Sequence, residues 1–106
     1  MEYLFQNCSS LTSLDISSFD TTFTSKINNM FEGCINLISI DLSNFNTSKV
    51  INMDNMFKGC IKLEFLDISN FETNSVISME GMFRKCSSLI YLNMKSVVIK
   101  DSIKIN

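Results

Sequence analysis

The sequence repeats itself every 26 residues without an insertion or a deletion, and this period constrains the fold more than any other feature. Phenylalanines and cysteines mark it most clearly, at Phe5, Phe31, Phe57 and Phe83 and at Cys8, Cys34, Cys60 and Cys86. A fixed period of this length is typical of proteins in which each repeat buries its apolar side chains only against its neighbours. One copy alone could not bury its own apolar residues.

The repeats follow the consensus M-F-x-x-C-x-x-L-x-x-L-D-[I/L]-S-x-F-x-T-x-x-V-x-x-M, and a chain of 106 residues has room for one folding unit. We therefore predict a single domain over residues 1–106, with repeats at about 4–29, 30–55, 56–81 and 82–96. Residues 97–106 are predicted to form a carboxyl-terminal cap, because the last repeat of an array must be shielded from water. A final strand or pair of strands is expected there, from Val97, Val98, Ile99, Ile103 and Ile105.

One part of each repeat has the pattern of a strand. Leu63–Ser69 contains L-x-x-L-x-I, the strand-bearing pattern of leucine-rich repeats. We predict a short strand near Phe65–Ile68 and at the equivalent positions of the other repeats.

A second part of each repeat has a helical period. Met53, Met56 and Phe57 are spaced as on one face of a short helix. Asn52 and Ser78 are suitable N-caps, and Gly59 fits a helix end that needs a positive φ. The predicted fold class is therefore a leucine-rich-repeat-like solenoid of about four coils, each with one short parallel strand and one short helical turn.

The run MFEGCINLISIDLSNFNTSKV, from Met30 to Val50, resembles the repeat of the BspA-like leucine-rich-repeat group of bacterial surface proteins. The similarity covers roughly residues 1–96, although the last repeat has Asn93 and Val97 where the pattern has Asp and Phe. The resemblance implies a curved solenoid, a location at the cell surface or outside the cell, and adhesion to host cells or matrix proteins. No signal or anchor is visible in this chain.

The composition disfavours several classes of function. The formal net charge is −2 and no long run of either sign occurs, which does not favour a nucleic-acid partner. No apolar run approaches the roughly 18 residues that span a bilayer, so direct membrane insertion is not expected. Because histidine is absent, the usual proton shuttle near neutral pH is missing. We predict no enzymatic activity, no catalytic residues and no cofactor.

The four cysteines allow three interpretations. A column of buried free thiols is favoured, since cysteine is often simply a small buried residue. A disulfide is disfavoured because equivalent side chains point in parallel, which keeps their Cβ atoms farther apart than the roughly 3.8 Å that a bridge prefers. A metal site lacks histidine and any C-x-x-C pair, so no metal ligand is predicted.

A column of aspartates, Asp15, Asp41 and Asp67, is expected to face outward on the strand side. Two carboxylates about 5 Å apart repel by roughly 0.8 kcal/mol in water, so the column needs compensation. Hydrogen bonds from the serines two residues on, or from backbone N–H groups, are the favoured source. A bound cation is the alternative, although calcium prefers six or more oxygens. Catalysis is least favoured, because nothing distinguishes one aspartate from the next.

Positions that vary between repeats are the candidates for specificity. Exposed aromatic and aliphatic residues beside charged ones are good anchors for a protein partner. The alternative is that flanking loops cover them. The predicted partner-binding residues are Ile38, Asp41, Glu64, Phe65, Asp67, Ile90 and Tyr91.

We interpret the chain as a non-enzymatic interaction or adhesion module that binds a host or extracellular-matrix protein through its strand-bearing face. The alternative is a structural or antigenic coat repeat without a dedicated ligand. Met1 falls in register with Met53 and Met79, so the chain is expected to begin inside a repeat. Its uncapped amino end is expected to be truncated or covered by a partner, with end-to-end self-association as one form of that contact.

Overall fold

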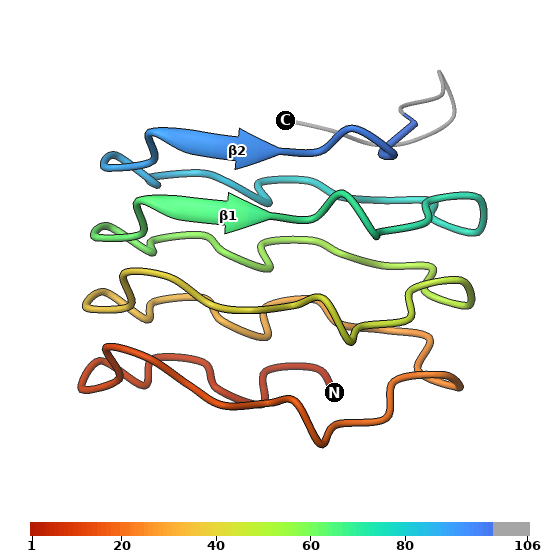
Figure 1. Cartoon of the computed structure of the whole chain (residues 1–106), viewed down its shortest axis with the longest axis horizontal. Coiled ribbons are helices and arrows are strands. Elements are labelled where there is room, and N and C mark those ends of the chain that lie inside the picture. Colours follow the sequence, from red (N-terminus) through yellow and green to blue (C-terminus); the bar gives the residue numbers. More distant parts are fainter. Residues whose placement is uncertain (99–106) are drawn as a thin grey trace.

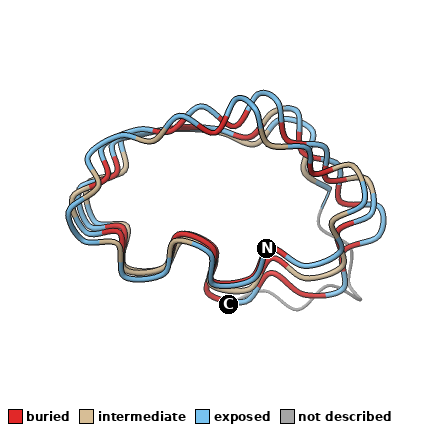
Figure 2. Cartoon of the chain, turned by 90° about the horizontal axis from the view of Figure 1, so that it is seen from below, coloured by how far each residue is buried: buried red, intermediate tan, exposed pale blue. Residues whose placement is uncertain are grey.

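A computed structural model describes residues 1–98 of the chain. Successive repeats lie on one another as layers (Figure 1), and seen along the stack they follow nearly the same outline (Figure 2). We call them layer 1 (residues 4–29), layer 2 (30–55), layer 3 (56–81) and layer 4 (82–98). The 26-residue period of the sequence is therefore a spatial period, which places equivalent residues above one another.

Within residues 1–98, regular strands occur in two layers only. Strand β1 spans Phe65–Asp67 in layer 3 and strand β2 spans Tyr91–Asn93 in layer 4, and the two pair in parallel with Phe65 opposite Tyr91. An isolated bridge between Ser39 and Phe65 carries the pairing into layer 2. Aromatic residues favour paired, extended chain. Layers 1 and 2 have Ser13 and Ser39 at this position, which accounts for the absence of assigned strands there.

The predicted fold class is wrong. Residues 1–98 contain no helix, and strands occupy only three residues each in layers 3 and 4. A leucine-rich-repeat-like solenoid with a strand and a helical turn in every coil is therefore not the architecture. Strand β1 does lie within the predicted stretch Phe65–Ile68. Most of the remaining chain consists of turns and irregular segments.

Backbone hydrogen bonds explain why no helix forms in the turn segment (residues 27–34, and its equivalents 53–60 and 79–86). The N–H groups of Ile27, Asn29, Phe31 and Gly33 donate to carbonyls 25 residues further on, in the next layer, over 2.8–3.1 Å. Between them, the N–H groups of Met30 and Glu32 donate three residues back, within their own turn. A helix needs its N–H groups for bonds four residues back. Pairing with the neighbouring layer removes half of these donors.

Two left-handed residues, four apart, recur with the period in the turn segment. The φ angles are 59° at Asn29 and 55° at Asn55, and 74° at Gly33 and 75° at Gly59. Asparagine and glycine adopt this conformation most readily. The predicted positive φ of Gly59 is confirmed, but it belongs to a turn and not to a helix end. Asn55 lies in the middle of the stretch predicted to be helical.

The predicted helix caps have another role. Asn52 and Ser78 pair with each other in an isolated parallel bridge between layers 2 and 3. The side-chain Oδ1 of Asn52 accepts a hydrogen bond of 2.8 Å from the N–H of Asp54, as a cap would, but no helix follows.

A stack of phenylalanine rings runs through the core. Neighbouring ring centroids in the series Phe5, Phe31, Phe57 and Phe83 are 5.6–6.1 Å apart and the rings are within 9° of parallel. Phe31 and Phe57, which have a neighbour on both sides, are fully buried. Such rings contribute strongly to stability, because each removes a large apolar surface from water.

A column of buried threonines joins the layers on another side. The hydroxyl of Thr47 donates to the carbonyl of Glu72 over 2.9 Å and accepts from the N–H of the same residue over 2.7 Å. Thr21 bonds Asn46 in the same way, and Thr73 bonds Val98. Each threonine therefore substitutes for a backbone partner at a position where the chains do not pair directly. The predicted cap at 97–106 falls, beyond Val98, outside the described residues.

We expect Phe57→Ala to lower the free energy of unfolding by about 3–5 kcal/mol, because it leaves a cavity between two rings. Phe23→Ala is the matched control: Phe23 is 81% exposed and contacts the Lys49 ammonium at 4.2 Å, a contact that contributes under about 1 kcal/mol. Urea denaturation measures both. Equal effects of the two substitutions would contradict the stacked core.

Substitutions of Asn55 test the turn segment, because a turn and a helix predict opposite orders of stability for the alanine and glycine variants. Asn55→Ala should destabilise by about 1 kcal/mol, because alanine tolerates a positive φ poorly, whereas Asn55→Gly should be close to neutral. In a helix the order would reverse, since alanine is the best and glycine among the poorest helix formers. A denaturation series in which the alanine variant is the most stable would show that this segment is helical.

Candidate functional site

The candidate site is the strand face, formed by the exposed side chains of residues 12–17, 38–43, 64–69 and 90–95. The four apolar candidates are open to solvent, with exposed fractions of 46% for Ile38, 53% for Phe65, 79% for Ile90 and 41% for Tyr91. Flanking loops therefore do not cover them. The acidic candidates Asp41, Glu64 and Asp67 are exposed as well. All seven residues are thus exposed in the strand-bearing part of layers 2 to 4, the structure brings Asp41, Phe65, Asp67 and Tyr91 together, and the role of all seven in binding stays a prediction.

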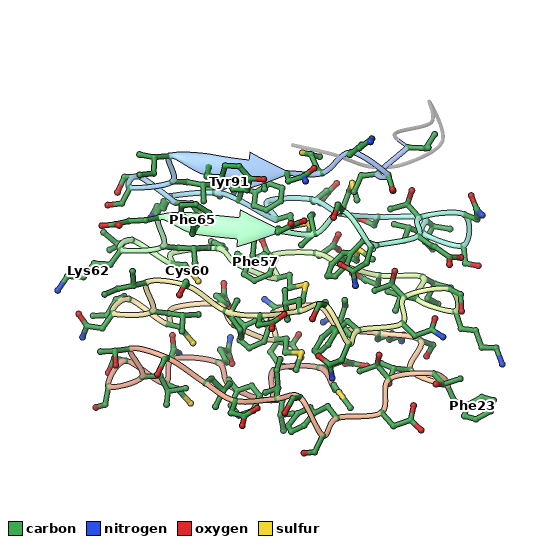
Figure 3. The ribbon with its side chains drawn as sticks, viewed as in Figure 1. Phe23, Phe57, Cys60, Lys62, Phe65 and Tyr91 are labelled. Carbon is green, nitrogen blue, oxygen red and sulfur yellow. The ribbon has the colours of Figure 1, made fainter. Side chains whose placement is uncertain are left out.

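Phe65 and Tyr91 form the centre of this face. They are the opposed first residues of β1 and β2, and their ring centroids lie 4.6 Å apart at an interplanar angle of 17°. Figure 3 shows the two labelled rings one above the other on the strands, with Phe23 at the opposite edge of the molecule. Since directly opposed side chains of a parallel pair lie close together, strand pairing itself holds the rings in contact. They form a preassembled aromatic surface.

The aspartate column is compensated by local hydrogen bonds, as the serine spacing predicts. Oδ1 of Asp15 accepts from the hydroxyl of Ser17 at 2.7 Å and from its N–H at 3.0 Å. Oδ1 of Asp41 and of Asp67 each accept from the N–H of the serine two residues on, at 2.9 Å.

These bonds favour the charged form of the carboxylates. Side-chain and backbone hydrogen bonds from Ser43 lower the pKa of Asp41 although the charge of Asp15 acts in the opposite direction, and those from Ser69 lower the pKa of Asp67. The face therefore carries ionised carboxylates at neutral pH.

Shallow hollows lie beside the aspartates at successive layer steps. One of about 340 Å³ between layers 2 and 3 is lined by Asp41, Phe65 and Asp67 together with Ser39, Ser69 and Asn70. A similar one of about 330 Å³ between layers 1 and 2 includes Asp15 and Asp41. Only the first has an aromatic wall. An acidic hollow beside an exposed ring suits a cationic group with an apolar stem.

Two asparagines beside this face have a structural role that was not predicted from the sequence. The Nδ2 group of Asn44 lies within 2.9–3.3 Å of the carbonyls of Ile16, Ser17 and Phe19 in layer 1, and Asn70 repeats the arrangement one layer on. The amide ties down a bend of the preceding layer. Their signal in the sequence is an asparagine at the same position of two consecutive repeats.

The cysteines form a column of free thiols. The thiols of Cys34, Cys60 and Cys86 each donate to the carbonyl of the core phenylalanine one layer before, over 3.1–3.2 Å. Burial raises the pKa of Cys34 to about 11 and that of Cys60 to about 12. Such thiols are poor nucleophiles and poor metal ligands, because both roles need the thiolate.

Other features of residues 1–98 lie away from the strand face. An apolar hollow of about 240 Å³ beside layer 4 is lined mainly by core side chains, among them Met82, Phe83 and Met94. Val97, which replaces the phenylalanine of the other repeats, leaves part of this space. Across the described part, no three potential metal ligands from His, Cys, Asp and Glu come together. Nor does it contain a helix long and apolar enough to cross a membrane.

The described layers define a repeat protein whose stacked units share their buried positions and differ on one exposed face. The chain matches the family described as "Mycoplasma protein of unknown function, DUF285" over residues 1–105, and it belongs to that family. The comparison with curated proteins and with solved structures found no match.

Thiol labelling of the native protein should follow burial. At pH 8 a thiol with a pKa near 11 is a thiolate in only about one molecule in a thousand, so Cys34 and Cys60 should react far more slowly than in denaturant. Mass spectrometry of labelled peptides assigns the rates. Native-state labelling of Cys60 at its denatured rate would contradict the buried thiol column.

Proposed function

We propose that this chain is a non-enzymatic protein-interaction or adhesion module that binds a host or extracellular-matrix protein through the strand face. The observation that carries the proposal is the exposed, stacked pair of Phe65 and Tyr91 on the paired strands, with Ile38 and Ile90 exposed in the neighbouring column. A soluble protein rarely leaves a stacked aromatic pair and neighbouring aliphatic residues open to water without a use for them. Aromatic side chains are also the most frequent binding hot spots.

The pattern of variation between repeats supports the same proposal. Buried positions change little from layer to layer, because each must fit the layer beneath it. At the position of Phe65 the series is Ser13, Ser39, Phe65 and Tyr91, and its small polar members lie at the amino end. Stacking does not require this change, which concentrates apolar surface on layers 3 and 4.

The resemblance of Met30–Val50 to the repeat of BspA-like surface proteins supports a location at the cell surface or outside the cell. Adhesion is the function that this resemblance implies. The absence of enzymatic activity is part of the proposal. The hollows of the strand face are shallow, and the same aspartate and serine positions recur in both of them. Catalytic carboxylates, by contrast, need distinct environments.

The test is binding of the purified chain to a panel of matrix proteins and to cultured host cells. Phe65→Ala with Tyr91→Ala should reduce binding at least about tenfold, as expected when two central aromatic anchors are lost. Phe23→Ala with Ile77→Ala is the matched control, since both residues are exposed and lie outside the strand face. Circular dichroism and urea denaturation check that each variant keeps its fold.

Binding that survives the first pair of substitutions would exclude the strand face as the interaction surface. No binding to any member of the panel would favour the alternative, a structural or antigenic coat without a dedicated ligand.

A further inference from the structure

We propose that the strand face recognises an extended segment of the partner protein with an apolar residue at one position and an arginine or lysine two positions along. This inference rests on the proposed function and specifies the chemistry of its partner. The apolar residue would pack on the Phe65–Tyr91 pair. The cationic group would lie in the hollow between Asp41 and Asp67.

The spacing of the face matches an extended chain. Phe65 and Asp67 are two residues apart on β1, and both side chains are exposed while Leu66 between them is buried. Side chains i and i+2 of a strand lie on one face about 6.6 Å apart. An extended segment lying along β1 has the same i, i+2 repeat, so one of its side chains meets the aromatic pair as the next meets the carboxylates.

The charge of the face favours a cationic partner. Its exposed charged residues are Asp15, Asp41, Glu64 and Asp67, against Lys95 as the one cation among these columns in the described chain. The serine N–H groups occupy Oδ1 of Asp41 and Asp67. Both carboxylates are exposed, and their remaining lone pairs are open to an incoming donor. Arginine can donate to two such oxygens at once.

An aromatic wall distinguishes this hollow from the one between layers 1 and 2. Phe65 lines the hollow beside Asp41 and Asp67, whereas the hollow between layers 1 and 2 has no aromatic residue in its lining. A guanidinium or ammonium group gains from contact with an aromatic ring in addition to its ion pair, and its methylene stem covers apolar surface. Binding of the cationic group is therefore expected between layers 2 and 3 and not along the whole aspartate column.

Three synthetic peptides test the proposal, in which a leucine is followed two positions along by arginine, by glutamine or by glutamate, with serine at the positions between. We expect the arginine peptide to bind the folded chain most tightly and the glutamate peptide least. Binding of the arginine peptide should weaken between about 0.05 and about 1 M salt, because salt screens exposed charges. Titration calorimetry or fluorescence anisotropy measures the dissociation constants.

Asp41→Asn with Asp67→Asn should weaken binding of the arginine peptide about two- to tenfold and leave that of the glutamine peptide unchanged. The control Asp20→Asn with Glu72→Gln removes two exposed charges elsewhere; Asp20 makes the same bond to a backbone N–H two residues on. This control double variant should bind the arginine peptide about as tightly as the unmodified chain. A glutamine peptide that binds as tightly as the arginine peptide, an effect shared equally by the control, or no binding of any peptide would overturn the proposal.

The two proposals fail in different ways. If Phe65→Ala with Tyr91→Ala abolishes binding to the matrix or cell panel while Asp41→Asn with Asp67→Asn does not affect it, the strand face is the binding surface but its partner is not selected by positive charge. If the aromatic substitutions leave panel binding intact, the proposed function itself is wrong.

Discussion

The structure depends on the competition for backbone N–H groups in the turn segment. The turn segments at residues 27–34 and 53–60 donate alternate N–H groups to the layer that follows, and only the remaining ones close turns within the layer. This division holds the layers in a register of one repeat, because a slip by one residue would place apolar side chains where polar ones belong. A buried N–H without a partner is costly, so the register is enforced at every step of the stack.

Once the register is set, the same side chain recurs above itself and must be able to pack on a copy of itself. Phenylalanine can stack with parallel rings, cysteine can donate its thiol to the carbonyl one layer before, and threonine can donate to and accept from a single residue. Charged residues meet this requirement only with compensation. The aspartate column exists because each carboxylate accepts bonds from the serine two residues on.

The sequence allowed the period, the buried columns and the compensation of Asp15, Asp41 and Asp67 to be predicted, because these follow from which residues recur. It did not allow the fold class to be predicted. The spacing of Met53, Met56 and Phe57 fits one face of a helix, yet it also fits two turns closed by left-handed residues. The sequence signal for such turns was the recurrence of residues that readily adopt a positive φ, namely Asn29, Gly33, Asn55 and Gly59. The strand pattern recurs in all repeats, but among residues 1–98 regular pairing joins only Phe65–Asp67 to Tyr91–Asn93, where the Phe65–Tyr91 contact adds to the backbone bonds.

The requirement for self-stacking also accounts for the composition of the strand face. Interior positions cannot vary without disturbing two neighbouring layers, whereas the outward positions of residues 12–17 and their equivalents contact solvent on one side. Replacing serine, as at Ser39, by phenylalanine, as at Phe65, therefore changes the stability of the stack little but alters the surface greatly. Because Phe65 and Tyr91 are consecutive members of one column, the pairing that stabilises the strands also aligns the two rings. Stacking thus converts variation at single positions into a continuous surface, and carboxylates already held in place by the serines lie beside it.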